Sequence, residues 1–230
     1  MKDFLAGSVY FGIVLSLLGY FLGMFLHKKT KSNLCNPLLL SAVFVIAFLL
    51  LTGTPYADYE AGAQYLSYLL TPATVCLAVP LYQQLSLLRR HYRAILIGIV
   101  SGVLASVGSV LLFSFLFQLS HEHYVTLLPK SVTTAIGIGI TEELGGIPAI
   151  ASAVIILTGI LGNVTAEWFC RLLRIREPVA VGLAIGTASH ALGTAKALEL
   201  GETEGAMSSL AVAVSGLITV VFASIFSNFL

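Results

Sequence analysis

The chain has 230 residues, of which 57% are hydrophobic and only 10% are charged, and its mean hydropathy is +0.96. Charged residues make up about a quarter of an ordinary soluble domain, so this composition excludes that class and predicts a polytopic membrane protein. The formal net charge of +1 says little about partners, because the position of the charges matters more than their sum in a membrane protein. Three widely separated cysteines, Cys35, Cys76 and Cys170, give neither a disulfide framework nor the spacing of a metal site.

The length suits a single all-α membrane domain over residues 1–230 with about 7–8 spans, since each span takes about 20 apolar residues. An extra N-terminal helix is expected over 4–26, ahead of a lysine-rich stretch. Within it, Gly19 and Gly23 form a GxxxG face that permits close helix packing. That face suits either a contact inside the chain or the interface of a homodimer.

The next segments contain one conspicuous interruption. A span is predicted from Pro37 to about Thr52, followed by a polar, acidic loop and then by a third apolar segment over about 64–87. The third segment carries two prolines, which remove backbone donors and clash with the preceding turn, so we expect its helix to be broken or strongly kinked near Thr71. Residues 94–118 form an uninterrupted span.

The stretch 131–170 is unusual because a short glycine-rich segment and Glu142-Glu-Leu-Gly-Gly-Ile-Pro148 precede a long apolar helix. It is too long for one helix, but it fits a re-entrant segment or half-helix followed by a full span. Such irregular backbone is tolerated in a membrane where it is buried or lines a cavity. Two further spans are predicted over 178–198 and 206–229.

Nine of the twelve Lys and Arg residues fall in three clusters, at 28–31, 89–93 and 171–176. The positive-inside rule places these clusters in the cytoplasm, which predicts a bacterial inner-membrane protein with its N-terminus outside and its C-terminus cytoplasmic. The segments of 37–118 and 131–229 then form two triplets of opposite orientation, the first and second halves of an inverted repeat. The middle segment of each triplet is interrupted, and such paired interruptions are the best sequence indication of a transporter site.

Polar residues within the second interrupted segment indicate where a solute would bind. The sequence Gly186-Thr-Ala-Ser-His-Ala-Leu-Gly-Thr-Ala-Lys196 puts a histidine, a lysine and three hydroxyls where a lipid-facing helix would carry leucines, and polar groups at that depth usually face a cavity or a solute path. Broken helices also expose N-termini that attract anions. The predicted substrate-binding residues are Thr71, Pro72, Thr74, Thr133, Thr134, Thr187, Ser189, His190, Gly193, Thr194 and Lys196.

Each of these residues also has a structural interpretation. Serine and threonine in membrane helices often bond to a neighbouring carbonyl or hold helices together, a buried histidine can be a satisfied structural residue, and Lys196 can extend to the headgroups. His190 is a candidate for proton coupling because histidine titrates near neutral pH. Glu142 and Glu143 are candidates for a proton or cation site if the following glycine turn lies inside the membrane, and are merely solvated if it lies at the surface.

Several of these stretches resemble the LrgB/CidB family of antiholin-like membrane proteins, which includes the C-terminal membrane part of the plastid glycolate/glycerate translocator. The resemblance covers about residues 5–229. The stretches that carry it are Asn36-Pro37, Leu70-Thr-Pro-Ala-Thr-Val-Cys-Leu-Ala-Val-Pro-Leu-Tyr82, Leu128-Pro-Lys-Ser-Val-Thr-Thr134, Gly145-Gly-Ile-Pro148, Leu157-Thr-Gly-Ile-Leu-Gly162 and Gly186–Lys196.

The resemblance implies two functions. One is a secondary transporter of small monocarboxylates of the pyruvate, glycolate or glycerate type, coupled to protons or cations and working by alternating access. The other is an antiholin-like regulator of murein hydrolase export and autolysis that acts with a small holin-like LrgA/CidA-type membrane protein. An enzyme is not expected, since no nucleophile elbow, metal cluster or phosphate loop is visible, and neither a cofactor nor a nucleic-acid partner is expected because the basic residues are juxtamembrane and short.

Overall fold

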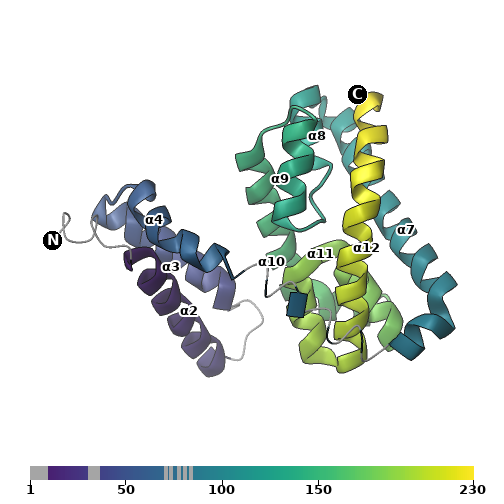
Figure 1. Ribbon diagram of the computed structural model, residues 1–230, viewed down its shortest axis with the longest axis horizontal. Helices are drawn as coiled ribbons and strands as arrows, with labels where there is room; N and C mark the ends of the chain where they lie inside the picture. Colours follow the sequence, from purple (N-terminus) through teal and green to yellow (C-terminus); the bar gives the residue numbers. More distant parts are fainter. Residues whose placement is uncertain are drawn as a thin grey trace. The chain divides into compact units, whose positions relative to one another are not determined.

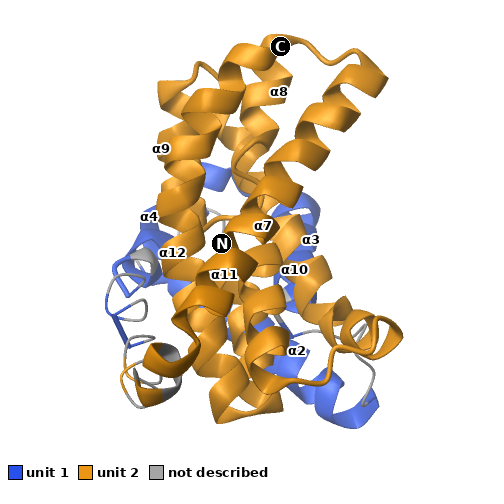
Figure 2. Ribbon diagram, turned by 90° about the vertical axis from the view of Figure 1, so that its right-hand side faces the viewer, with its two compact units in different colours: residues 1–76 blue, residues 77–230 orange. Residues whose placement is uncertain are grey.

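The computed structural model describes residues 10–30, 37–69 and 85–230, together with 72, 75, 76, 79 and 82. All regular structure within these residues is helical, as predicted, and it belongs to two compact units, residues 1–76 and 77–230 (Figures 1 and 2). Four helices in the described part are long and apolar enough to cross a membrane, namely Phe11–Thr30, Arg89–Phe117, Pro148–Leu172 and Glu202–Phe229. The composition and these helices identify a membrane protein, while the larger number of spans stays a prediction.

The first unit contains α2 (Phe11–Thr30), α3 (Pro37–Thr52) and α4 (Tyr56–Ser67). Helix α2 packs on both of the others. A Cβ atom added at Gly23 would lie 2.6 Å from the Pro37 carbonyl oxygen, and one at Gly19 would lie 3.0 Å from the Ser41 hydroxyl. The GxxxG face is therefore used for packing inside the chain.

Helix α4 occupies the region that the sequence predicted to be a polar loop, so that prediction was wrong. Its inner face repeats at helical spacing through Tyr59, Gly62 and Ala63, whose backbone approaches Gly12 of α2, and the Tyr59 hydroxyl lies 2.8 Å from Ser16 Oγ. Two acidic residues gave the segment the composition of a polar loop. They do not prevent a helix, because a helix needs only one buried apolar face.

From residue 85 onward, the second unit contains three long helices and three shorter or broken ones. Its elements are α7 (Leu85–Phe117), α8 (His121–Leu127), α9 (Thr134–Glu143), α10 (Pro148–Leu172), α11 (Pro178–Leu200), α12 (Glu202–Phe226) and a 3-10 turn over Ser227–Phe229. Residues at every fourth position of α7, Ile95, Ile99, Val103 and Val107, are buried in one core with α12 residues such as Met207. This apolar stripe is what fixes α7 against the rest of the unit.

The first hairpin consists of α8, the loop 128–133 and α9. Its two ends lie together, because the Ile147 amide beyond α9 donates to Thr126 Oγ1 of α8 over 2.8 Å. Its loop reaches the middle of α7, where Ser131 Oγ lies 2.9 Å from Ser106 Oγ. With ten residues, α9 extends only about 15 Å, half the thickness of a membrane core. The α8–α9 hairpin is therefore too short to cross a membrane, and the predicted re-entrant path stays a prediction.

The second hairpin is α11 itself, which folds back at His190 (φ 43°, ψ −142°). A Cβ atom added at Gly193 would lie 3.1 Å from the Ile185 carbonyl oxygen, whereas residues eight apart in a straight helix are about 12 Å apart. The halves 178–189 and 191–200 thus run in opposite directions. The interruption within 178–198 was predicted, but the predicted net crossing by this segment is wrong, because both of its ends lie at the same end of the unit, beside residues 204–207.

The fold-back changes the direction of the last helix. Gly182 of the first half packs against Met207 near the start of α12, and at the far end of α12 the Tyr124 hydroxyl donates to the Phe226 carbonyl over 2.7 Å. His121 Nδ1 similarly donates to the Leu230 carbonyl over 2.7 Å. Leu230 therefore lies at one end of the second unit, and the arginines at 89–93 and 171–176 lie at the other end. The sequence analysis predicted that Leu230 and these arginines lie on the same side of the membrane.

Candidate functional site

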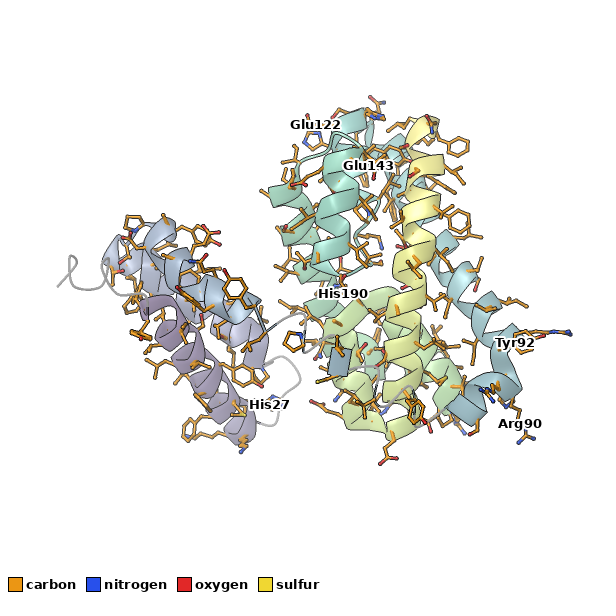
Figure 3. All side chains as sticks on the ribbon, in the orientation of Figure 1. His27, Arg90, Tyr92, Glu122, Glu143 and His190 are labelled. Carbon is orange, nitrogen blue, oxygen red and sulfur yellow. The ribbon has the colours of Figure 1, made fainter. Side chains whose placement is uncertain are left out.

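The polar segment 186–196 surrounds the fold-back of α11 at His190, which lies near the middle of the second unit (Figure 3). His190 is only 3% exposed, and its Nε2 donates to the Ile155 carbonyl of α10 over 2.9 Å. Because a carbonyl oxygen only accepts, this bond fixes the proton on Nε2. The imidazole thus stabilises a sharp backbone turn, and its predicted roles in substrate binding and proton coupling stay predictions.

The hydroxyls around the turn hold backbone and neighbouring helices. Thr194 Oγ1 donates to the His190 carbonyl over 3.1 Å and lies 2.8 Å from Ser208 Oγ of α12. Thr187 Oγ1 donates to the Leu183 carbonyl over 2.7 Å. These bonds match the structural interpretation of membrane hydroxyls. Thr187 in addition lines a large cleft described below.

Small residues make the tight turn sterically feasible. A Cβ atom added at Gly159 would lie 2.6 Å from the His190 ring, and one at Gly193 would lie 2.6 Å from Ser189 Cβ. Ser189 is buried against Gly162 and lines a second, smaller cavity of about 340 Å³ between α10 and α11. Gly193 thus lets the two halves of the hairpin approach, and its predicted role in substrate binding stays a prediction.

Other predicted site residues lie away from the fold-back. Lys196 Nζ pairs with Glu199 at 3.0 Å and with Glu167 of α10 at 3.8 Å. Glu142 and Glu143 are exposed at the end of α9, and their predicted role as a proton or cation site stays a prediction.

The remaining predicted residues divide between the first hairpin and the first half of the chain. Thr133 precedes α9 and Thr134 is its first residue, so both lie where the first hairpin turns. Pro72 is helical and exposed. Thr71 and Thr74 lie outside the described residues, so the predicted pairing of Thr71 with the His190 region stays a prediction.

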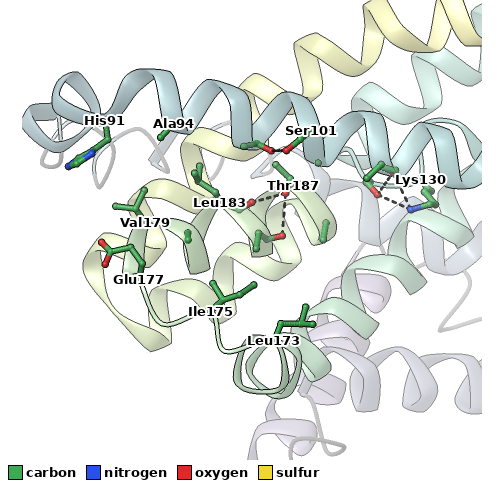
Figure 4. A pocket seen from close by; sticks show the side chains of 18 residues that line it. His91, Ala94, Ser101, Lys130, Leu173, Ile175, Glu177, Val179, Leu183 and Thr187 are labelled. Carbon is green, nitrogen blue, oxygen red and sulfur yellow. Dashed lines mark hydrogen bonds between the residues drawn. The ribbon is translucent and has the colours of Figure 1, made fainter.

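A cleft of about 1110 Å³ runs between α7 and the first half of α11 (Figure 4). His91, at a kink in α7, lies at one end together with Glu177, and Lys130 of the first hairpin lies at the other. Lys130 Nζ donates to Ser106 Oγ over 3.1 Å and to Ser131 Oγ over 3.2 Å. Fifteen residues of α7 separate His91 from Ser106, so the cleft extends about 22 Å into the unit.

Lys130, Ser106 and Ser131 were missing from the predicted site. The predicted site consists mainly of polar groups inside apparent spans, whereas Lys130 follows a proline in a stretch predicted to lie outside the membrane. A signal was nevertheless present, because Lys130 is one of three cations that fall outside the basic clusters. A cation on the side of a membrane protein that carries few of them is unexpected under the positive-inside rule.

Comparison with known proteins assigns the family. No solved structure matches the chain. The model of the LrgB-like family matches residues 16–229, which is nearly the whole sequence. The protein with these two opposed hairpins therefore belongs to the LrgB-like family.

Proposed function

We propose that this protein is a secondary transporter of small monocarboxylates that works by alternating access. The observation that carries the proposal is the pair of hairpins that enter the second unit from opposite ends and turn near its middle. Both turns approach Ile155 of α10, which contacts Gly137 of the first hairpin and accepts the His190 hydrogen bond of the second. Discontinuous helices that meet at mid-depth are typical of transporter binding sites.

Each hairpin is followed by a long helix, and the two pairs run in opposite directions. Helices α8–α9 are followed by α10, which ends at the arginine-rich end, while α11 is followed by α12, which ends beside α8. Such an inverted arrangement supports a carrier, because two similar halves of opposite orientation can open toward opposite sides of the membrane. The predicted repeat of 37–118 with 131–229 extends over both units and stays a separate prediction.

The hairpins also suit an anionic solute. Helix α9 and the second half of α11 both begin at the turns of their hairpins, and the first N–H groups of a helix have no intrahelical partner and carry a partial positive charge. The Thr133 side chain does not cap α9. Backbone donors near the turns are therefore placed to stabilise a carboxylate.

Counterflow in proteoliposomes tests the proposal. Purified protein is expected to take up radiolabelled pyruvate, glycolate or glycerate. Unlabelled acid inside the vesicles should increase uptake of the label, because a carrier exchanges an internal solute molecule for an external one. Protein-free liposomes are the control. Unselective leakage without counterflow would contradict the proposal, and together with co-purification of a small holin-like protein it would favour the antiholin-like alternative.

A further inference from the structure

Lys130 is a cation with neutral partners at the inner end of the cleft. Its ammonium has three donors, and the described structure gives two of them to Ser106 and Ser131. Every ion pair found among the described residues involves Arg171 or Lys196 instead. A charge at membrane depth is costly unless it is paired, so the free donor of Lys130 is a place where an anion would be strongly stabilised.

The cleft gives an anion access to this lysine from one end. Its outer end is lined by His91 and Glu177, which belong to the segments that carry the basic clusters. Six exposed arginines occupy those segments, and a surface rich in one charge raises the local concentration of the opposite ion. They are Arg89, Arg90, Arg93, Arg171, Arg174 and Arg176.

The walls of the cleft limit the kind of anion. Between its two ends they are mainly small and apolar, with Gly98, Gly102 and Ala105 on α7 facing Ala180 and Ala184 on α11. The polar side chains of Ser101 and Thr187 already donate to carbonyls of their own helices. A single cation at the end of an apolar path matches one carboxylate attached to a short uncharged group, and it offers no partner for a second carboxylate.

We propose that Lys130, together with the hydroxyls of Ser106 and Ser131, binds the carboxylate of a small monocarboxylate that enters the cleft from the arginine-rich end. This inference rests on the proposed transport function and names its anion site. The structure then represents the state that is open toward the arginine-rich end. In this state the turn of the first hairpin is the part that binds the solute.

Binding and counterflow measured on the same variants test the site. In Lys130→Met, pyruvate affinity in detergent and pyruvate counterflow are both expected to fall at least tenfold, while Lys130→Arg should retain part of each. The matched control is Lys29→Met, which removes an exposed lysine of α2 and should change neither. Wild-type protein should bind pyruvate at least tenfold more tightly than its neutral amide or the dicarboxylate succinate.

Thermal unfolding of the same variants separates binding from folding. Lys130 is half-buried and has only neutral partners, so no ion pair offsets the cost of removing its charge from water, and a hydrophobic side chain of similar length avoids that cost. Lys130→Met should therefore unfold at or above the wild-type temperature, and a marked decrease would indicate a structural lysine and overturn the site.

The two proposals fail in different ways. Wild-type counterflow that persists unchanged in Lys130→Met would overturn the Lys130 site and leave the transport function standing. Lys130-dependent pyruvate binding without any counterflow would support the site and overturn transport. Equal binding of succinate and pyruvate would refute the assignment to monocarboxylates.

Discussion

His190 combines a strained backbone with a buried side chain. Its φ of 43° lies in a region that side chains other than glycine rarely adopt, and such a residue costs about 1–3 kcal/mol that the surrounding structure must offset. The bond from Nε2 to the Ile155 carbonyl and the close packing against Gly159 provide that compensation. The side chain thus holds a conformation that its own backbone disfavours.

Two substitutions at this position should differ in stability. His190→Ala and His190→Gly both lose the imidazole bond, but only glycine relieves the strained backbone, so the glycine variant should be more stable by about 1–2 kcal/mol. Chemical denaturation in detergent measures the difference. Ala195→Gly, at an exposed site in the regular second half of α11, is the control and should lose about 1 kcal/mol. An alanine variant at least as stable as the glycine variant would contradict the fold-back.

At the scale of the element, composition predicts where α11 breaks but not where the chain goes afterwards. The polar residues between Gly186 and Lys196 mark the interruption correctly, yet a kink and a fold-back have the same composition. The distinction depends on contacts with other helices, such as Gly182 against Met207 and Gly162 against Ser189. Those contacts join residues whose proximity no local pattern reveals.

The charges after α11 did not resolve this ambiguity. Residues 197–205 contain three glutamates and neither lysine nor arginine, and acidic residues contribute little to orientation in a membrane. The acidic stretch was therefore compatible with either side. The family and the all-α class were predictable because they depend on motifs, hydropathy and segment length, and the irregularity within 131–170 was predictable because that stretch is too long for one helix.

Glycines provide a test of the α10–α11 contact. In Gly162→Ala the added methyl group would overlap the Ser189 side chain, whereas a Cβ at Gly108 of α7 meets nothing within 4 Å. Gly162→Ala should therefore destabilise the protein by about 1–3 kcal/mol through overpacking. Gly108→Ala should be neutral or stabilising by up to about 1 kcal/mol, since alanine favours the helix. Equal thermal unfolding temperatures for the two variants would contradict the packing.

At the scale of the whole molecule, the second unit has two distinct ends. One carries the arginines of α7 and of the loop after α10, and the other carries Glu122, Glu143 and the chain terminus. Lys130 was missed because it reaches the cleft through the turn of a hairpin that begins at the acidic end. Lys130 therefore lines a cleft that opens at the arginine-rich end, although its hairpin begins at the acidic end.

Cysteine labelling tests the relation between the two ends. In protein from which Cys35, Cys76 and Cys170 have been removed, Arg174→Cys and Asn228→Cys each place one thiol at an exposed position. A membrane-impermeant maleimide should label them from opposite sides, Arg174→Cys in inside-out vesicles and Asn228→Cys in right-side-out ones. Labelling of both from the same side would restore the single crossing over 178–198 and contradict the hairpin.

The fold-back of α11 also has a consequence for biosynthesis. Its two halves leave the ribosome before α12 exists, but the hairpin packs against Met207, Ser208 and Ala211 of that last helix. The turn at His190 can meet Ile155 of α10 early, but the halves of the hairpin gain their contacts with α12 only when synthesis is nearly complete. Chains released shortly before residue 212 would lack this support, so quality-control proteases are expected to remove such truncated products even though most of the 230 residues have been made.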